Sequence, residues 1–136
     1  NGAIYGAEII RGIDVFELEP SAHLSANEIA AAKSVMLNEF NAQMQPMFEW
    51  DDTPVVARAY LDQLERENRI LASRAQAVDR VLTAAESGNA NGVQLNAVAS
   101  DLEADAVAVE AMELGGDADK LAQLASVLRG IAMMER

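Results

Sequence analysis

The sequence predicts an all-α protein: an antiparallel bundle of about four helices with one long central helix and a short N-terminal helical or irregular segment. Apolar residues recur at helical spacing along most of the chain, and aromatic residues make up only 4% of it. With 136 residues the chain is long enough for one domain with a core. We therefore expect residues 1–136 to form a single helical domain, in which residues 1–24 pack on a bundle formed by residues 25–136.

The N-terminal segment, residues 1–20, fits two interpretations. Its apolar residues recur at spacings of four, four and three, as in a helix: Tyr5, Ile9, Ile13 and Phe16. The stretch from Ile13 to Pro20 also reads as extended chain, and each of the three glycines in the segment would weaken a helix by about 1 kcal/mol. We favour a short or broken helix that lies on the bundle.

The first clear helix is expected to begin at Ser25, because Ser25 and Glu28 match the capping-box pattern. Pro46 should end or kink this helix near Gln45. Its apolar stripe consists of Ile29, Ala32, Met36, Phe40, Met44 and Met47.

The central helix is expected to start with Thr53 as N-cap and Pro54 at the first helical position. No Gly or Pro follows until Gly88. One uninterrupted helix from Pro54 to about Ser87 would be on the order of 50 Å long.

Two further helices should follow the Gly- and Asn-rich loop at residues 88–92, where positive φ angles allow a sharp turn. The third helix carries an apolar stripe and should stop at Gly115 and Gly116. Asp117 should cap the fourth. The two stripes consist of Leu95, Val98, Leu102, Ala106 and Val109, and of Leu121, Leu124, Leu128 and Ile131.

The central helix carries a heptad pattern with spacings of 3 and 4: Leu61, Leu64, Asn68, Leu71, Ala75, Val78, Leu82 and Ala85. Asn68 takes an a position, where a buried Asn fixes the register of coiled coils. The seam fits packing on the chain's own helices, and it also fits packing on a second chain. A helix of ~50 Å would overhang a compact domain with a radius of gyration of about 14 Å, so we favour a homodimer.

Phe48 and Trp50 form a second candidate interaction site, in a short acidic connection after Pro46. An aromatic pair at this position either plugs the end of the bundle or anchors a partner protein. The interaction residues expected from the sequence are Phe48, Trp50, Leu61, Leu64, Asn68, Leu71, Val78 and Leu82.

The formal net charge of −12 disfavours nucleic acid and anionic membranes as partners, and it suits a basic protein or solubility alone. The chain has no Cys and one histidine, His23, and it lacks phosphate-loop, EF-hand and di-iron patterns. We therefore assign no catalytic residue, cofactor or metal. Methionine thioethers can bind Cu(I), but we favour the interpretation that these methionines are core residues.

These observations predict a non-enzymatic protein–protein interaction or assembly module that forms a homodimer. The alternative is a bundle that binds a small apolar ligand in a pocket lined by Met36, Phe40, Met44 and the aromatic residues of the N-terminal segment. The chain begins with Asn1 rather than Met, which suits a mature exported form or an excised domain. No motif resembles a known family.

Overall fold

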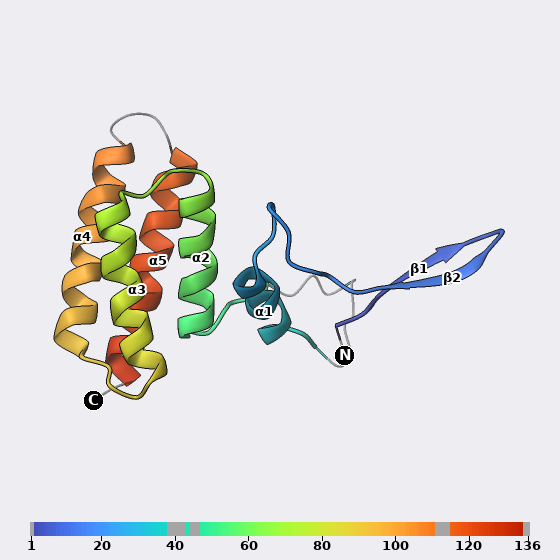
Figure 1. Cartoon of the computed structure of the whole chain (residues 1–136), viewed down its shortest axis with the longest axis horizontal. Helices are drawn as coiled ribbons and strands as arrows, with labels where there is room; N and C mark the ends of the chain where they lie inside the picture. The colour runs from blue at the N-terminus through green and yellow to red at the C-terminus, as the bar shows by residue number, and fades with distance from the viewer. Residues whose placement is uncertain (1, 38–42, 44–46, 111–114, 135–136) are drawn as a thin grey trace.

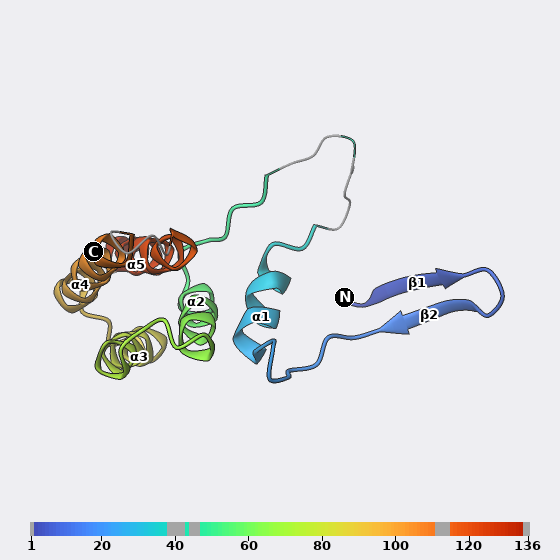
Figure 2. The same cartoon turned by 90° about the horizontal axis from the view of Figure 1, so that it is seen from above.

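The computed structural model describes residues 2–37, 43, 47–110 and 115–134. In this part of the chain, four helices lie side by side as a bundle, a fifth lies against its outside, and two strands extend away from it (Figures 1 and 2). In chain order the elements are β1 Ile4–Glu8, β2 Gly12–Phe16, α1 Ala26–Ser34, α2 Pro54–Arg66, α3 Ala72–Glu86, α4 Gly92–Glu110 and α5 Gly115–Met134.

The prediction that helices predominate is confirmed, but the prediction of a purely all-α protein is wrong. The N-terminal segment is an antiparallel β-hairpin, in which Ile4 pairs with Phe16 and Glu8 with Gly12. Its strands are rich in β-branched and aromatic residues, which favour extended backbone over helix. Gly12 has a φ of +103°, which glycine adopts readily where the chain leaves the turn.

The prediction of a single long central helix is also wrong, because residues 67–71 separate this region into two helices, α2 and α3. Asn68 has a φ of +55°. Its amide donates to the carbonyl of Glu65 at 3.0 Å, and the Arg69 amide donates to the carbonyl of Leu64 at 2.8 Å. This hydrogen-bond pair is a Schellman motif, with Asn68 in the left-handed position that ends the helix. Asn68 is thus a helix stop and not a buried coiled-coil residue.

The placement of Asn68 predicts opposite effects for two substitutions. Asn68→Leu puts a branched side chain in left-handed backbone and should lower the free energy of unfolding by about 1–2 kcal/mol. Asn68→Gly should leave it unchanged or raise it by up to about 1 kcal/mol. Urea denaturation followed by circular dichroism measures both. A stable Asn68→Leu variant with an altered oligomeric state would instead support the seam expected from the sequence.

The capping box at the start of α1 is confirmed. The Ser25 hydroxyl accepts from the Glu28 amide at 3.1 Å, and the Glu28 carboxylate accepts from the Ser25 amide at 2.7 Å. The helix is shorter than expected, ending at Ser34 instead of near Gln45. The Ser34 hydroxyl donates to the carbonyl of Ala31 at 2.7 Å, and this bond competes with continuation of the helix. Phe40 and Met44 lie outside the described residues.

The later helix boundaries are close to those expected. Thr53 is the N-cap of α2 with Pro54 at its first position, although the Thr53 hydroxyl makes no capping bond. The loop at residues 88–92 separates α3 from α4, and the Asn91 side chain accepts from the Val93 amide at 3.0 Å. The fourth predicted helix begins three residues early, since α5 starts at Gly115 and includes Asp117, the expected N-cap.

The core of the bundle lies between α2, α3, α4 and α5, and α4 pairs most extensively with α5. Small residues such as Ala99 and Ala125 are fully buried and let these two helices approach closely. The largest fully buried side chains are Leu64, Val78, Leu82, Leu95, Leu102, Leu121, Leu124 and Leu128.

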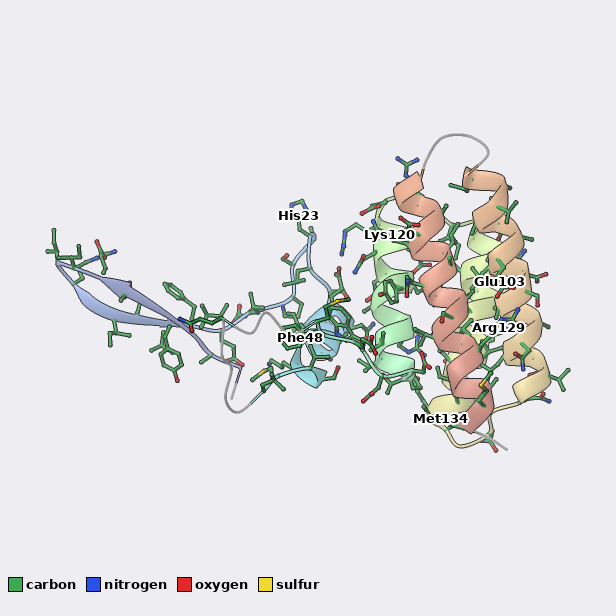
Figure 3. The ribbon with its side chains drawn as sticks, turned by 180° about the vertical axis from the view of Figure 1, so that it is seen from behind. His23, Phe48, Glu103, Lys120, Arg129 and Met134 are labelled. Carbon is green, nitrogen blue, oxygen red and sulfur yellow. The ribbon has the colours of Figure 1, made fainter. Side chains whose placement is uncertain are left out.

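Arginine clamps tie neighbouring helices together at the surface of the bundle. Arg58 of α2 binds Glu86 of α3 through two hydrogen bonds of 2.6 and 2.9 Å. Arg129 of α5 binds Glu103 of α4 at 2.6 and 2.7 Å, and Figure 3 shows these two side chains facing each other. Arg74 of α3 binds two carboxylates of α4, those of Asp101 and Asp105. Bidentate pairs of this kind fix how the helices align along their axes.

Candidate interaction site

The β-hairpin stands away from the rest of the molecule as an arm, and residues 4, 5 and 7–20 are all exposed (Figure 2). Paired residues of an antiparallel ladder point to the same side, so the register sorts the arm into two faces. We define the apolar face as Tyr5, Ala7, Ile13 and Val15. It contains no charged residue. The opposite face consists of Ile4, Gly6, Glu8, Gly12, Asp14 and Phe16.

The opposite face is partly covered by one of the arm's own side chains, and the charged residues of the two strands lie on it. A Cβ on Gly6 would lie 3.2 Å from the Phe16 ring, so the ring packs across the glycine in the neighbouring strand. Glu8 and Asp14 lie on the same face. The arm therefore presents one apolar side and one mixed, acidic side.

The tip of the arm consists of Ile9, Ile10 and Arg11. Ile9 and Ile10 have exposed fractions of 105% and 90%, so both side chains are fully in solvent. Arg11 forms an ion pair with Glu8 across the turn, which occupies the only cation of the arm. The tip is therefore apolar as well, because both isoleucines are exposed and Arg11 is paired with Glu8.

The apolar face and the tip expose more apolar surface than the largest patch of a typical monomer. At about 150–250 Å² for a fully exposed large side chain, their five large apolar residues together expose on the order of 700 Å². The largest apolar patch of a typical monomer is about 300–600 Å². A two-stranded hairpin alone in water is only marginally stable, and it becomes independently stable when its apolar face is covered or further strands join it.

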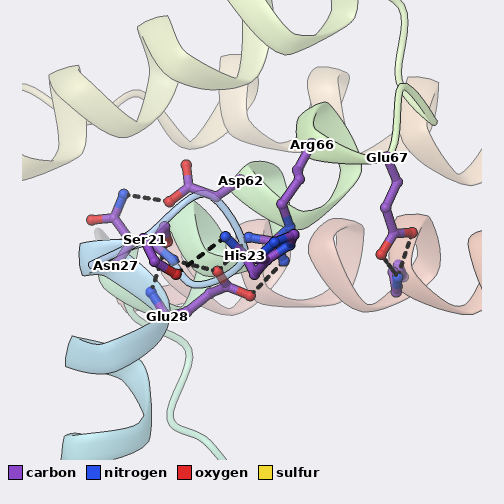
Figure 4. A network of polar contacts seen from close by, with 9 residues as sticks. Ser21, His23, Asn27, Glu28, Asp62, Arg66 and Glu67 are labelled. Atoms are coloured by element: carbon purple, nitrogen blue, oxygen red, sulfur yellow. Dashed lines mark hydrogen bonds and ion pairs between the residues drawn. The ribbon is translucent and has the colours of Figure 1, made fainter. Parts of the chain in front are cut away.

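The base of the arm leads into α1, which lies on α2 through a polar network (Figure 4). The Arg66 guanidinium donates to both Glu28 oxygens, at 2.7 and 2.9 Å. The Asn27 amide donates to Asp62 at 2.9 Å. The hydrogen bonds from Arg66 are the main cause that lowers the pKa of Glu28 to about 2, with the Ser25 amide adding to the effect. Glu28 therefore both caps α1 and fastens it to the bundle.

Trp50 lies over the junction of α1 and α2. Its indole N–H donates to the carbonyl of Ala31 at 3.0 Å, although 46% of the residue is exposed. It lines a shallow groove of about 260 Å³ with Val56 and Tyr60. This volume is below the range of about 300–1,000 Å³ that small-molecule sites occupy. Phe48 is exposed nearby (Figure 3). The structure thus places Trp50 against α1 and α2, and its role as a plug or as a partner anchor stays a prediction.

The heptad residues do not form one exposed surface. Four of them, Leu61, Leu64, Val78 and Leu82, lie in the core of the bundle. The other two site residues on the seam, Asn68 and Leu71, lie at the break, and Leu71 is 71% exposed. The helices of this chain therefore already cover most of the seam.

Groups that could support catalysis are sparse in the described residues. His23 projects from the loop before α1 and is exposed (Figure 3). Within residues 2–37, 43, 47–110 and 115–134, no three His, Cys, Asp or Glu side chains gather as a metal site would require. Met36 and Met47 are exposed and not in the core, and Met44 lies outside the described residues.

None of the helices in the described part of the chain combines the length and apolar character that a membrane span needs. No known family model, curated protein or solved structure matches the chain.

The arm was not predicted as a site because Tyr5, Ile9, Ile13 and Phe16 also recur at helical spacing. The signal that could have found it is the alternation of Ile13, Asp14 and Val15 beside a glycine. The exposure of these side chains cannot be predicted from the local sequence, because the same residues would also suit a buried strand.

Proposed function

We propose that this chain is a non-enzymatic assembly module, in which a helical bundle presents a β-hairpin arm to another protein. The observation that carries the proposal is the uncharged apolar face of an arm that stands off the bundle. Burial of an exposed Ile or Val side chain stabilises a complex by about 1.5–3 kcal/mol. The arm therefore gains most of its stability when another surface covers it.

The charge of the molecule supports a protein as the covering surface. Eight Lys and Arg side chains of the described residues are held in ion pairs: Arg11, Lys33, Arg58, Arg66, Arg69, Arg74, Lys120 and Arg129. The acidic surplus is thus left largely unneutralised, and it repels phosphate groups of nucleic acids and anionic lipids. A protein surface that combines an apolar centre with basic or neutral edges suits the arm better.

The test compares two variants of the full-length chain, each of which carries a photo-reactive residue on a different face of the arm. Benzoylphenylalanine in place of Ile13 lies on the apolar face, and the same residue in place of Asp14 lies on the opposite face of the same strand. After irradiation in the cells that make the protein, we expect a cross-linked protein with the first variant and little with the second. Equal yields at both positions, or no protein product at Ile13, would contradict the proposal.

A further inference from the structure

We infer that the protein covering the arm is a second copy of this chain, and that two arms pack through their apolar faces about a two-fold axis. This inference rests on the proposed function, since it requires the arm to be an interaction surface. Four properties of the arm carry it: the area it offers, its strand number, the position of its charges, and its distance from the bundle.

The exposed area of one arm is what a stable dimer requires. Standard protein interfaces bury about 800 Å² on each partner. The apolar face, the tip and Leu18 of one arm together expose on the order of 800 Å². When the arms run antiparallel, the tip of one copy, with Ile9 and Ile10, lies beside the base of the other, where Leu18 is exposed. The antiparallel arrangement therefore covers the tips as well as the apolar faces.

Two arms together also make a more stable β-structure than one arm. Each arm supplies two strands of five residues. A two-stranded hairpin alone is only marginally stable in water, and the facing arm covers the apolar face that each hairpin would otherwise expose. Identical uncharged faces are self-complementary, which a two-fold interface demands.

The charges of the molecule allow this contact although each copy carries a net charge of −12. Glu8 and Asp14 point away from the apolar face, so no carboxylate of the strands enters the interface. Antiparallel arms hold the two acidic bundles at opposite ends. A strand of five residues spans about 17 Å, whereas charges in physiological salt are screened within about 8 Å. The two bundles therefore repel each other weakly.

The first measurement is sedimentation of the full-length chain over a range of concentrations. We expect a dimer. The double variant Ile13→Thr/Val15→Thr keeps β-branched residues but removes apolar surface from both copies, and it should raise the dimer dissociation constant at least a hundredfold. The matched control Asp14→Thr changes the opposite face of the same strand and should leave the constant within a few fold of the parent. Unchanged thermal unfolding of the bundle shows that each variant is folded.

The second measurement uses the absence of cysteine from the chain. A short bis-maleimide should join two Ala7→Cys chains, whose thiols lie on the paired faces, but not two Asp14→Cys chains. A monomer at every concentration, a dimer that the double variant leaves intact, or equal cross-linking at both positions would overturn the inference. In that case a photo-cross-link from Ile13 to a different protein would still support the proposed function, and no such product would end both.

Discussion

Acidification should release α1 from the bundle before the bundle unfolds, and Glu28→Gln should abolish this step. The pKa of Glu28 is lowered to about 2 from an ordinary value of 4.5, because Arg66 binds the ionised carboxylate. A lowered pKa contributes stability that is fully present above pH 4.5 and is lost as the pH falls toward 2. The shift corresponds to about 3 kcal/mol, most of it from the docking contact with Arg66 and the rest from the capping contact with Ser25.

Trp50 reports this release directly. It is the only tryptophan of the chain, and its indole N–H donates to a carbonyl within α1. Its emission should shift to the red between pH 4.5 and 2, while circular dichroism retains most of the helical signal. Glu28→Gln should give partly red-shifted emission already at pH 7 and no further acid step. A wild-type transition that persists unchanged in Glu28→Gln would show that other groups control the docking.

Other carboxylates titrate in the same acid range, and the helical signal is the control for them. The pKa values of Glu67, Glu86 and Glu103 are also lowered, chiefly by hydrogen bonds from Lys120, Arg58 and Arg129. These ion pairs join helices of the bundle, so their protonation reduces bundle stability. Their side chains are about half exposed, and solvent screening makes each of them weaker than the Glu28 pair.

The features that the sequence predicted correctly are those governed by local chemistry. The capping box of Ser25 and Glu28 and the Thr53–Pro54 helix start depend on residues within one turn. The apolar stripes of α4 and α5 were found because both helices bury one face along their whole length. These signals need no knowledge of what the rest of the chain does.

The break between α2 and α3 was missed because the heptad pattern continues through it. Leu64 and Val78 face the same core from two different helices, so their spacing imitates one continuous seam. Asn68 was the local signal for the break, since Asn is the residue that most often replaces glycine in left-handed helix ends. A buried Asn of a coiled coil and an Asn at a helix end cannot be separated by spacing alone.

The candidate site could not be predicted because its defining property is non-local. Ile13 and Val15 would serve equally well in a strand covered by the bundle. Only the relative positions of arm and bundle show that nothing in the described residues covers them. The net charge of −12 predicts that phosphate-bearing partners are disfavoured, and this stays a prediction.

Gly130→Ala should destabilise the protein, although alanine is the better helix former. Replacing an interior helical glycine by alanine ordinarily stabilises by about 1 kcal/mol. A Cβ on Gly130 would overlap both the carboxylate and the Cβ of Asp52, in the connection that leads into α2. The backbone at Asp52 must therefore move, which typically costs 1–3 kcal/mol. We expect a net loss of about 1–2 kcal/mol in the free energy of unfolding, measured by urea denaturation.

Two further variants isolate the overlap with Asp52. Gly116→Ala lies in the same helix where a Cβ would meet no atom within 4 Å, so it should be neutral or stabilising. Asp52→Gly removes the obstructing side chain, and in that background Gly130→Ala should become stabilising, a coupling of about 2–3 kcal/mol. If Gly130→Ala stabilises the parent as much as Gly116→Ala does, Asp52 does not lie on α5. The same contact holds the connection that carries Trp50, so Gly130→Ala should also weaken the docking of α1 and lower the acid stability of the Trp50 signal.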